Sequence, residues 1–225
     1  MFDISFDFET CALCPNAAVM SVGAVAWDRS NPISPFIKLK GGDVIDPSTQ
    51  YLAHVDLRGM FVDGFAFDKA TSDWWSRCSD DARNAVLAPD ECGVNCSPIQ
   101  DVVKGLFDFI EEVKDESHED VCLWAQGSDF DTAILRNICY KYGLEIPVKY
   151  TQFRDHRTFF LEGARIICKA SGVDFDPHKA YLLVEPYEGE GSAHDPIVDC
   201  QRSFYSTWQM MNHLTCLKPQ KYKSM

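Results

Sequence analysis

The chain has 225 residues, of which 46% are hydrophobic and 12% aromatic, and its formal net charge at pH 7 is −13. This length and composition favour a globular protein with one sizeable core over a disordered chain. The acidic balance argues against a general electrostatic nucleic-acid binder, because phosphate contacts are normally made by an excess of Lys and Arg. It does not exclude a polyanionic substrate, since metal ions can lie between protein carboxylates and phosphate groups.

Targeting signals and membrane spans are not evident in the sequence. The first residues include Asp3 and Asp7 and lack a basic segment, and no apolar stretch has the length needed to cross a bilayer. We therefore expect a soluble cytoplasmic protein. If the chain is phage-encoded, the compartment would be the cytoplasm of the host cell. The ten cysteines show no disulfide framework, so we expect reduced thiols. A zinc site is an alternative that lacks a His at finger spacing, and its four ligands would be Cys11, Cys14, Cys92 and Cys96.

The N-terminal third of the chain is rich in predicted strands. Apolar runs at residues 1–10, 17–28 and 33–39 are typical of strands, and the connections between them are too short for crossover helices, so we expect antiparallel neighbours. Residues 48–57 are compatible with a short helix.

Two carboxylates in the first strand attract particular interest. Asp7 and Glu9 are two residues apart, so in a strand both point to one face while Phe6 and Phe8 point to the other. Neighbouring carboxylates oppose each other's ionisation unless a cation lies between them, and Mg²⁺ or Mn²⁺ would suit such a pair. The alternative is a solvent-facing pair on an edge strand.

The middle of the chain begins with a helical pattern over residues 71–88, which we expect to form two short helices broken near Ser79. Trp74 and Trp75 lie in the first of them. Adjacent helical residues point in different directions, so one indole can be in the core while the other faces a cleft and stacks on a base; burial of both rings is the alternative.

Helices and strands then alternate along the rest of the chain. We expect helices at 98–116, 130–142, 158–171 and 195–214, strands at 120–126 and 148–153, an acidic loop at 175–190 and a basic tail at 217–225. This order predicts an α/β protein with a mixed sheet, antiparallel in its first three strands and parallel in the later ones, flanked by helices. Sheets of this kind bind ligands at strand ends.

Three later residues bear on the first strand. Asp131 lies at a predicted helix start, His194 lies just before the last helix, and Asp199 lies within the first two turns of that helix. Taken singly, each has an ordinary explanation, because acids are favoured in the first turn of a helix by the dipole and His194 could be a surface residue.

Together these residues resemble a known family, the DnaQ-like (DEDD) 3′-5′ exonucleases whose last motif carries a histidine. The resemblance rests on Asp-Phe-Glu-Thr at 7–10, on Phe-Asp at 130–131, and on His194 with Asp199 five residues later. Phage-encoded exonucleases of the DexA type are the most similar, through Gly-Ser-Asp-Phe-Asp at 127–131, Arg-Asp-His-Arg-Thr at 154–158, Trp74-Trp75, and His-Asp-Pro-Ile-Val-Asp-Cys at 194–200. One position departs from the DnaQ pattern: Gly127 stands where an Asn is common.

The resemblance implies a ribonuclease-H-like fold, with residues 1–216 as a single exonuclease domain, and two ions of Mg²⁺ or Mn²⁺ per site. Asp7 would bridge both ions, Glu9 and Asp199 would complete one of them, Asp131 would act directly or through water, and His194 would be the general base. The reaction implied is 3′-5′ hydrolysis of single-stranded DNA or RNA to nucleoside 5′-monophosphates.

Substrate contacts are less closely defined by the sequence. Arg154, Arg157 and Lys149 are candidate phosphate contacts, although Arg154 could instead pair with Asp155, and Trp74 or Trp75 could stack on the terminal nucleotide. Two alternatives to an enzyme stay open here: a nucleic-acid-binding module that keeps the fold without hydrolysis, and an interaction protein whose acids are a solvated surface.

Overall fold

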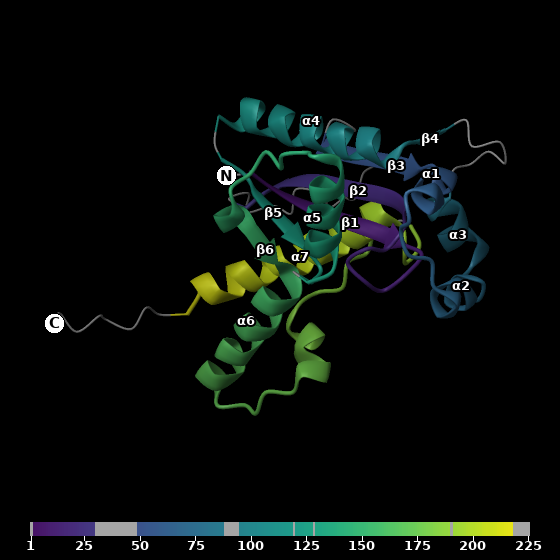
Figure 1. Ribbon diagram of the computed structural model, residues 1–225. Helices are drawn as coiled ribbons and strands as arrows, with labels where there is room; N and C mark the ends of the chain where they lie inside the picture. The colour runs from purple at the N-terminus through teal and green to yellow at the C-terminus, as the bar shows by residue number, and fades with distance from the viewer. Residues whose placement is uncertain are drawn as a thin grey trace.

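The computed structural model describes residues 2–29, 49–87, 95–118, 120–127, 129–189 and 191–217. Six strands form one mixed sheet in the order β4-β3-β2-β1-β5-β6, with helices on both faces (Figure 1). The strands are β1 (Phe2–Thr10), β2 (Val19–Asp28), β3 (Gln50–Val55), β4 (Cys96–Ser97), β5 (Cys122–Ala125) and β6 (Phe153–Asp155). The helices are α1 (Leu57–Val62), α2 (Lys69–Trp75), α3 (Asp80–Val86), α4 (Ile99–Ser117), α5 (Asp131–Tyr142), α6 (His156–Ser171) and α7 (Pro196–Thr215).

Strand β1 lies at the centre of the sheet and separates two packed layers. Its apolar side chains Ile4, Phe6 and Phe8 are buried in the main core beneath α4 and α5. The alternate residues face the other layer, where α7 packs on β1 and β2. The prediction that Phe6 and Phe8 point away from Asp7 and Glu9 is confirmed.

The strand directions confirm the predicted fold class. β1 pairs with β2, and β2 with β3, in antiparallel register, whereas β1-β5, β5-β6 and β3-β4 are parallel. The third antiparallel strand is Gln50–Val55. The sequence pattern had instead predicted a short helix at 48–57. That expectation is wrong because Tyr51, Ala53 and Val55 alternate and place one apolar face against the core. The strand predicted at 33–39 lies outside the described residues.

The strand predicted at 148–153 is also shorter and later than expected. Residues Tyr150–Gln152 form a 3₁₀ helix, and only Phe153–Asp155 pairs with β5. The Gln152 side chain accepts from the Lys149 backbone N–H at 2.7 Å and donates to the Val121 carbonyl at 2.7 Å. These hydrogen bonds stabilise the 3₁₀ turn, so the segment pairs with the sheet only from Phe153 onward.

The helices follow the sequence pattern closely. α2 and α3 are separate, with Ser79 capping α3, as predicted. α6 begins two residues earlier than expected because the Asp155 carboxylate caps it by accepting from the Thr158 N–H. The predicted acidic loop contains a 3₁₀ helix, Pro177–Leu183. None of the described helices is long and apolar enough to span a membrane. The basic residues of the tail at 218–225 lie outside the described residues.

Candidate active site

The acidic residues singled out in the sequence converge at the end of β1. Asp7 and Glu9 come from β1, Asp131 is the first residue of α5, and Asp199 lies in the first turn of α7. The Phe8 backbone N–H donates to Asp131 Oδ1 at 3.1 Å, which fixes the start of α5 against β1. Glu9 and Asp131 are buried, with 8% and 2% of their surfaces exposed, so these carboxylates do not form a solvated surface.

Gly23 allows α7 to approach β1 closely. It is the register partner of Asp7 on β2, and a Cβ added to it would lie 2.7 Å from both the carbonyl carbon and the Cβ of Pro196. The first turn of α7 therefore rests directly on the strand beside Asp7. The Cys200 thiol, one turn later, donates to the Gly23 carbonyl at 3.7 Å.

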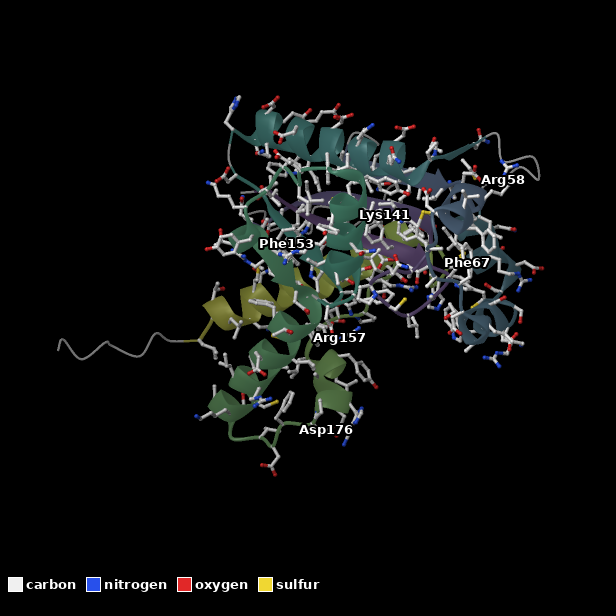
Figure 2. The ribbon with its side chains drawn as sticks, in the orientation of Figure 1. Arg58, Phe67, Lys141, Phe153, Arg157 and Asp176 are labelled. Atoms are coloured by element: carbon white, nitrogen blue, oxygen red, sulfur yellow. The ribbon has the colours of Figure 1, made fainter. Side chains whose placement is uncertain are left out.

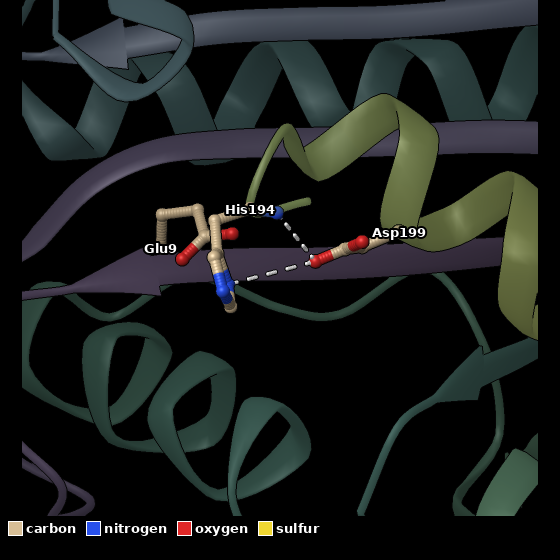
Figure 3. Close-up of side chains that lie close together, drawn as sticks. All are labelled: Glu9, His194 and Asp199. Carbon is tan, nitrogen blue, oxygen red and sulfur yellow. Dashed lines mark hydrogen bonds and ion pairs between the residues drawn. The ribbon is translucent and has the colours of Figure 1, made fainter. Parts of the chain in front are cut away.

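His194 lies in the loop immediately before α7. Its φ of 67° is left-handed, and its backbone N–H donates to Asp199 Oδ2 at 3.1 Å. Its ring Nδ1 lies 3.9 Å from the same oxygen. Ligand atoms of Glu9, His194 and Asp199 all lie within 4.8 Å of one another, and the three side chains converge from a strand, a loop and a helix (Figure 3).

The electrostatics of the cluster are those of crowded carboxylates. Burial raises the pKa of Asp7 well above its usual value, and the neighbouring Asp131, Glu9 and Asp199 raise it further. Burial and the nearby Asp199 and Asp131 raise the pKa of Glu9 to about 8. Burial raises the pKa of Asp131 to about 7, against the opposing effect of backbone N–H groups and of Arg157. Cations bound beside such a cluster would stabilise its charged form.

The donor set fits divalent metal ions. Four carboxylates and one imidazole offer the oxygen-rich coordination that Mg²⁺ and Mn²⁺ prefer, and a bound cation would relieve the repulsion that raises these pKa values. The one close group of potential ligands among the described residues contains no cysteine. Cys11, Cys14 and Cys96 belong to no close group of potential metal ligands among the described residues, and Cys92 lies outside them, so the zinc alternative gains no support.

A pocket of about 490 Å³ opens beside Glu9. Its walls are mainly apolar and include Phe8, Leu13, Trp74 and Phe130. The two tryptophans differ in exposure: Trp75 is 9% exposed and Trp74 is 39% exposed. This agrees with the alternative in which one ring is in the core and the other faces a cleft. The Trp75 indole N–H donates to the Thr10 carbonyl at 3.0 Å, whereas the Trp74 ring stands edge-to-face on His194, with centroids 4.7 Å apart.

The three candidate basic residues lie in different places. Lys149 pairs with Asp120 at 3.4 Å. Asp120 lies just before β5, which runs parallel to β1, so this pair is at the end of the sheet opposite the acid cluster. The Arg154 guanidinium donates to the carbonyls of Thr151 and Phe153. Arg157 alone of the three acts on the acid cluster, where its charge opposes the rise in the Asp131 pKa.

Two features of the site were not predicted from the sequence. Arg202 Nη1 lies 3.3 Å from Asp199 Oδ1, and its position three residues after Asp199 on a predicted helix was a usable signal. Gly127 has a φ of 134°, a region that favours glycine, which explains why Gly rather than Asn occupies this position.

Comparisons with solved structures establish the fold. The nuclease domain of 3′hExo, a DEDDh family member bound to rAMP, is 12% identical, with a TM-score of 0.53; the match covers 98% of this chain and 96% of that one. Cell-death related nuclease 4 (CRN-4) is 13% identical, with a TM-score of 0.57, and 95% of this chain matches 64% of that one. A 3′-exonuclease that recognises the 3′ end of histone mRNA stem-loop is 12% identical, with a TM-score of 0.50, over 96% and 64% of the two chains.

A search of curated proteins found no significant match. A family model described as the 3′-5′ exoribonuclease Rv2179c-like domain matches residues 3–202. The matched range contains every acidic residue of the cluster together with His194. The chain therefore belongs to the Rv2179c-like 3′-5′ exoribonuclease family.

Proposed function

We propose that this protein is a divalent-metal-dependent 3′-5′ exonuclease that removes nucleoside 5′-monophosphates from the 3′ end of single-stranded nucleic acid. The observation that carries the proposal is the convergence of Asp7, Glu9, Asp131 and Asp199 with His194. RNA is the substrate we favour, because the family is described as exoribonucleases. We further propose that residues 1–216 act as one domain. A particular likeness to phage DexA-type enzymes rests on the sequence motifs alone.

Each side chain of the cluster has a proposed role. Asp7, Glu9, Asp131 and Asp199 would hold two ions, with Asp7 shared between them, and His194 would accept a proton from the attacking water. When bound, Mg²⁺ or Mn²⁺ would neutralise the phosphate and make water more acidic. Because His194 Nδ1 faces Asp199, its Nε2 is the nitrogen available for the proton.

The apolar pocket beside Glu9 suits the terminal nucleoside. Trp74 lines this pocket and is 39% exposed, and aromatic side chains bind bases by stacking without reading their sequence. Trp75 would act on the substrate only indirectly, because its indole is buried and anchors α2 to the end of β1. We assign Arg157 to phosphate binding, whereas the bonds of Arg154 to backbone carbonyls give it a structural role.

Incubation of 5′-labelled single-stranded RNA and DNA with Mg²⁺ or Mn²⁺ tests the proposal. We expect RNA to be shortened stepwise from its 3′ end, with release of 5′-monophosphates. His194→Ala should lower kcat roughly 10²- to 10⁴-fold, as loss of a general base does. Asp7→Asn should lower it at least as much.

Glu112→Gln is the matched control, because Glu112 is an exposed acid on α4 and its loss should leave the activity unchanged. Failure to shorten either polymer, or full activity in both site variants, would show that the proposal is wrong. Tight binding without turnover would instead identify a non-hydrolytic nucleic-acid-binding module.

A further inference from the structure

A second pocket, of about 260 Å³, lies between α6 and α7. The polar side chains that line it are Gln126, His156, Arg157, Tyr181, Arg202, Ser203, Ser206 and Thr207. The described residues that line this pocket include two arginines and no acid, in a chain whose net charge is −13. Arg157 lies in the first turn of α6, where that helix meets the sheet (Figure 2), and helix N-termini favour anions.

Direct contacts connect this basic pocket to the acids. Arg202 binds Asp199 at 3.3 Å, and the Gln126 backbone N–H donates to Asp131. The Gln126 side-chain oxygen in turn accepts from the Ser203 hydroxyl at 3.3 Å. Glu9, another member of the cluster, belongs to the wall of the apolar pocket. The acid cluster therefore borders two pockets, one that contains Trp74 and one that contains Arg157 and Arg202.

The two pockets differ in the part of a nucleic acid that suits them. After the scissile phosphate, a 3′-terminal nucleoside carries no further phosphate, so it suits the pocket with apolar, aromatic walls. The chain that continues on the 5′ side carries one phosphate per nucleotide and requires cations. Arginine guanidinium groups bind phosphate oxygens through two parallel hydrogen bonds.

We infer that Arg157 and Arg202 form a subsite for the phosphate one linkage to the 5′ side of the scissile bond. The inference rests on the proposed exonuclease function and adds a direction to it. The substrate runs with its 3′ end in the apolar pocket beside Trp74 and its 5′ portion over α6 and α7. Arg202 has a further role, because it also holds Asp199.

A single neutral linkage in the substrate tests this subsite. The unmodified oligonucleotide is compared with one that carries a methylphosphonate one linkage 5′ of the scissile bond, and with one that carries it four linkages further upstream. For the wild-type protein we expect kcat/KM to fall about tenfold at the first position, the size expected for one lost charge-assisted contact, and to stay unchanged at the second.

Arg157→Gln should lower kcat/KM on the unmodified substrate by a similar factor and should no longer distinguish the two linkages. Arg157→Lys keeps the charge and should retain part of the discrimination, which tests the inference even if the Gln variant does not fold. Lys169→Gln removes one positive charge from the same helix, 12 residues and about 18 Å away, and should behave as wild type.

Three outcomes would overturn the inference. The first is a wild-type protein that is insensitive to the neutral linkage, and the second is an Arg157→Gln variant that discriminates as strongly as wild type. In both cases the exonuclease itself stands, because the unmodified substrate is degraded. If the wild type does not degrade the unmodified substrate, the proposed function and this inference fall together.

Discussion

Asp7 is repelled by each of the other carboxylates of the site, Glu9, Asp131 and Asp199. It lies among three other carboxylates, and burial together with these neighbours raises its pKa. A group whose pKa is higher in the folded than in the unfolded protein favours folding at low pH and loses that contribution as pH rises. At pH 8 without metal, either repulsion among the ionised carboxylates lowers the free energy of unfolding, or some of these carboxylates stay protonated in the folded protein.

Replacement of Asp7 by Asn should therefore separate stability from activity. At pH 8 in EDTA, we expect Asp7→Asn to unfold at a higher urea concentration than wild type. Its free energy of unfolding should be larger by about 1–3 kcal/mol, because one buried charge is removed. In wild type, Mg²⁺ at about 100 times its dissociation constant should add about 2.7 kcal/mol, and in the variant much less.

Glu112→Gln is again the control for charge removal, and it should follow wild type with and without metal. A metal-free Asp7→Asn protein that is less stable than wild type at pH 8 would contradict this account of the cluster.

At the scale of elements, the site depends on how closely α7 rests on the sheet. The strand β1 supplies Asp7 and Glu9 by simple alternation, but His194 and Asp199 reach them only because Gly23 leaves room for Pro196. The Asp195 carboxylate caps α7 by accepting from the Ile197 N–H at 2.9 Å, which fixes the helix start beside His194. One strand position thus controls the placement of a loop, a cap and a helix.

Gly23→Ala should therefore impair the site and the fold together. The added Cβ meets backbone atoms of Pro196 that cannot rotate away, so we expect a loss of about 1–3 kcal/mol in unfolding free energy and a larger relative loss of activity. Gly59→Ala is the matched control, since a Cβ at this position in α1 has nothing within 4 Å. It should be neutral or stabilising by up to about 1 kcal/mol. Equal behaviour of the two variants would show that the close approach of α7 is not required.

For the molecule as a whole, His156 joins the sheet to both helices of one layer. Its Nε2 is 2.8 Å from the Ser5 hydroxyl on β1, and its Nδ1 is 2.7 Å from the Thr207 hydroxyl on α7. The ring also stacks on Trp124, with centroids 5.0 Å apart. Burial lowers the pKa of His156 from 6.5 to about 3, so the folded protein holds this imidazole neutral.

The sign of the resulting pH dependence is opposite to that of the acid cluster. Between pH 6.5 and 3 the unfolded chain protonates His156 and the folded protein does not, so acid lowers the free energy of unfolding by up to about 1.4 kcal/mol per pH unit. In urea titrations from pH 7 to 4, the stability difference between wild type and His156→Gln should shrink toward low pH. His213→Gln, at an exposed position in α7, should show a difference from wild type that does not change in this way. A constant difference for His156→Gln would refute the prediction.

Much of the fold could be read from the sequence because its elements obey local periodicities. Period-two alternation at Phe6, Asp7, Phe8 and Glu9 predicted both faces of β1, and the helical spacing predicted the segments now seen as α4 and α5. The candidate acids and His194 were recognisable because their motifs are short and local. The errors came where local patterns were ambiguous: Gln50–Val55 is a strand, and Tyr150–Gln152 is a 3₁₀ helix held by Gln152.

The sequence by itself determined which residues are chemically able to form the site, since residue type and spacing are local properties. Only the tertiary structure decided that Arg157 acts on Asp131 while Arg154 is bound to carbonyls, that Arg202 holds Asp199, and that the acids border two pockets. It also decided the pairing of Gly23 with Asp7. The physical reason is that strand register, helix approach and desolvation depend on groups far apart in the chain, whose contacts form only when the core excludes water.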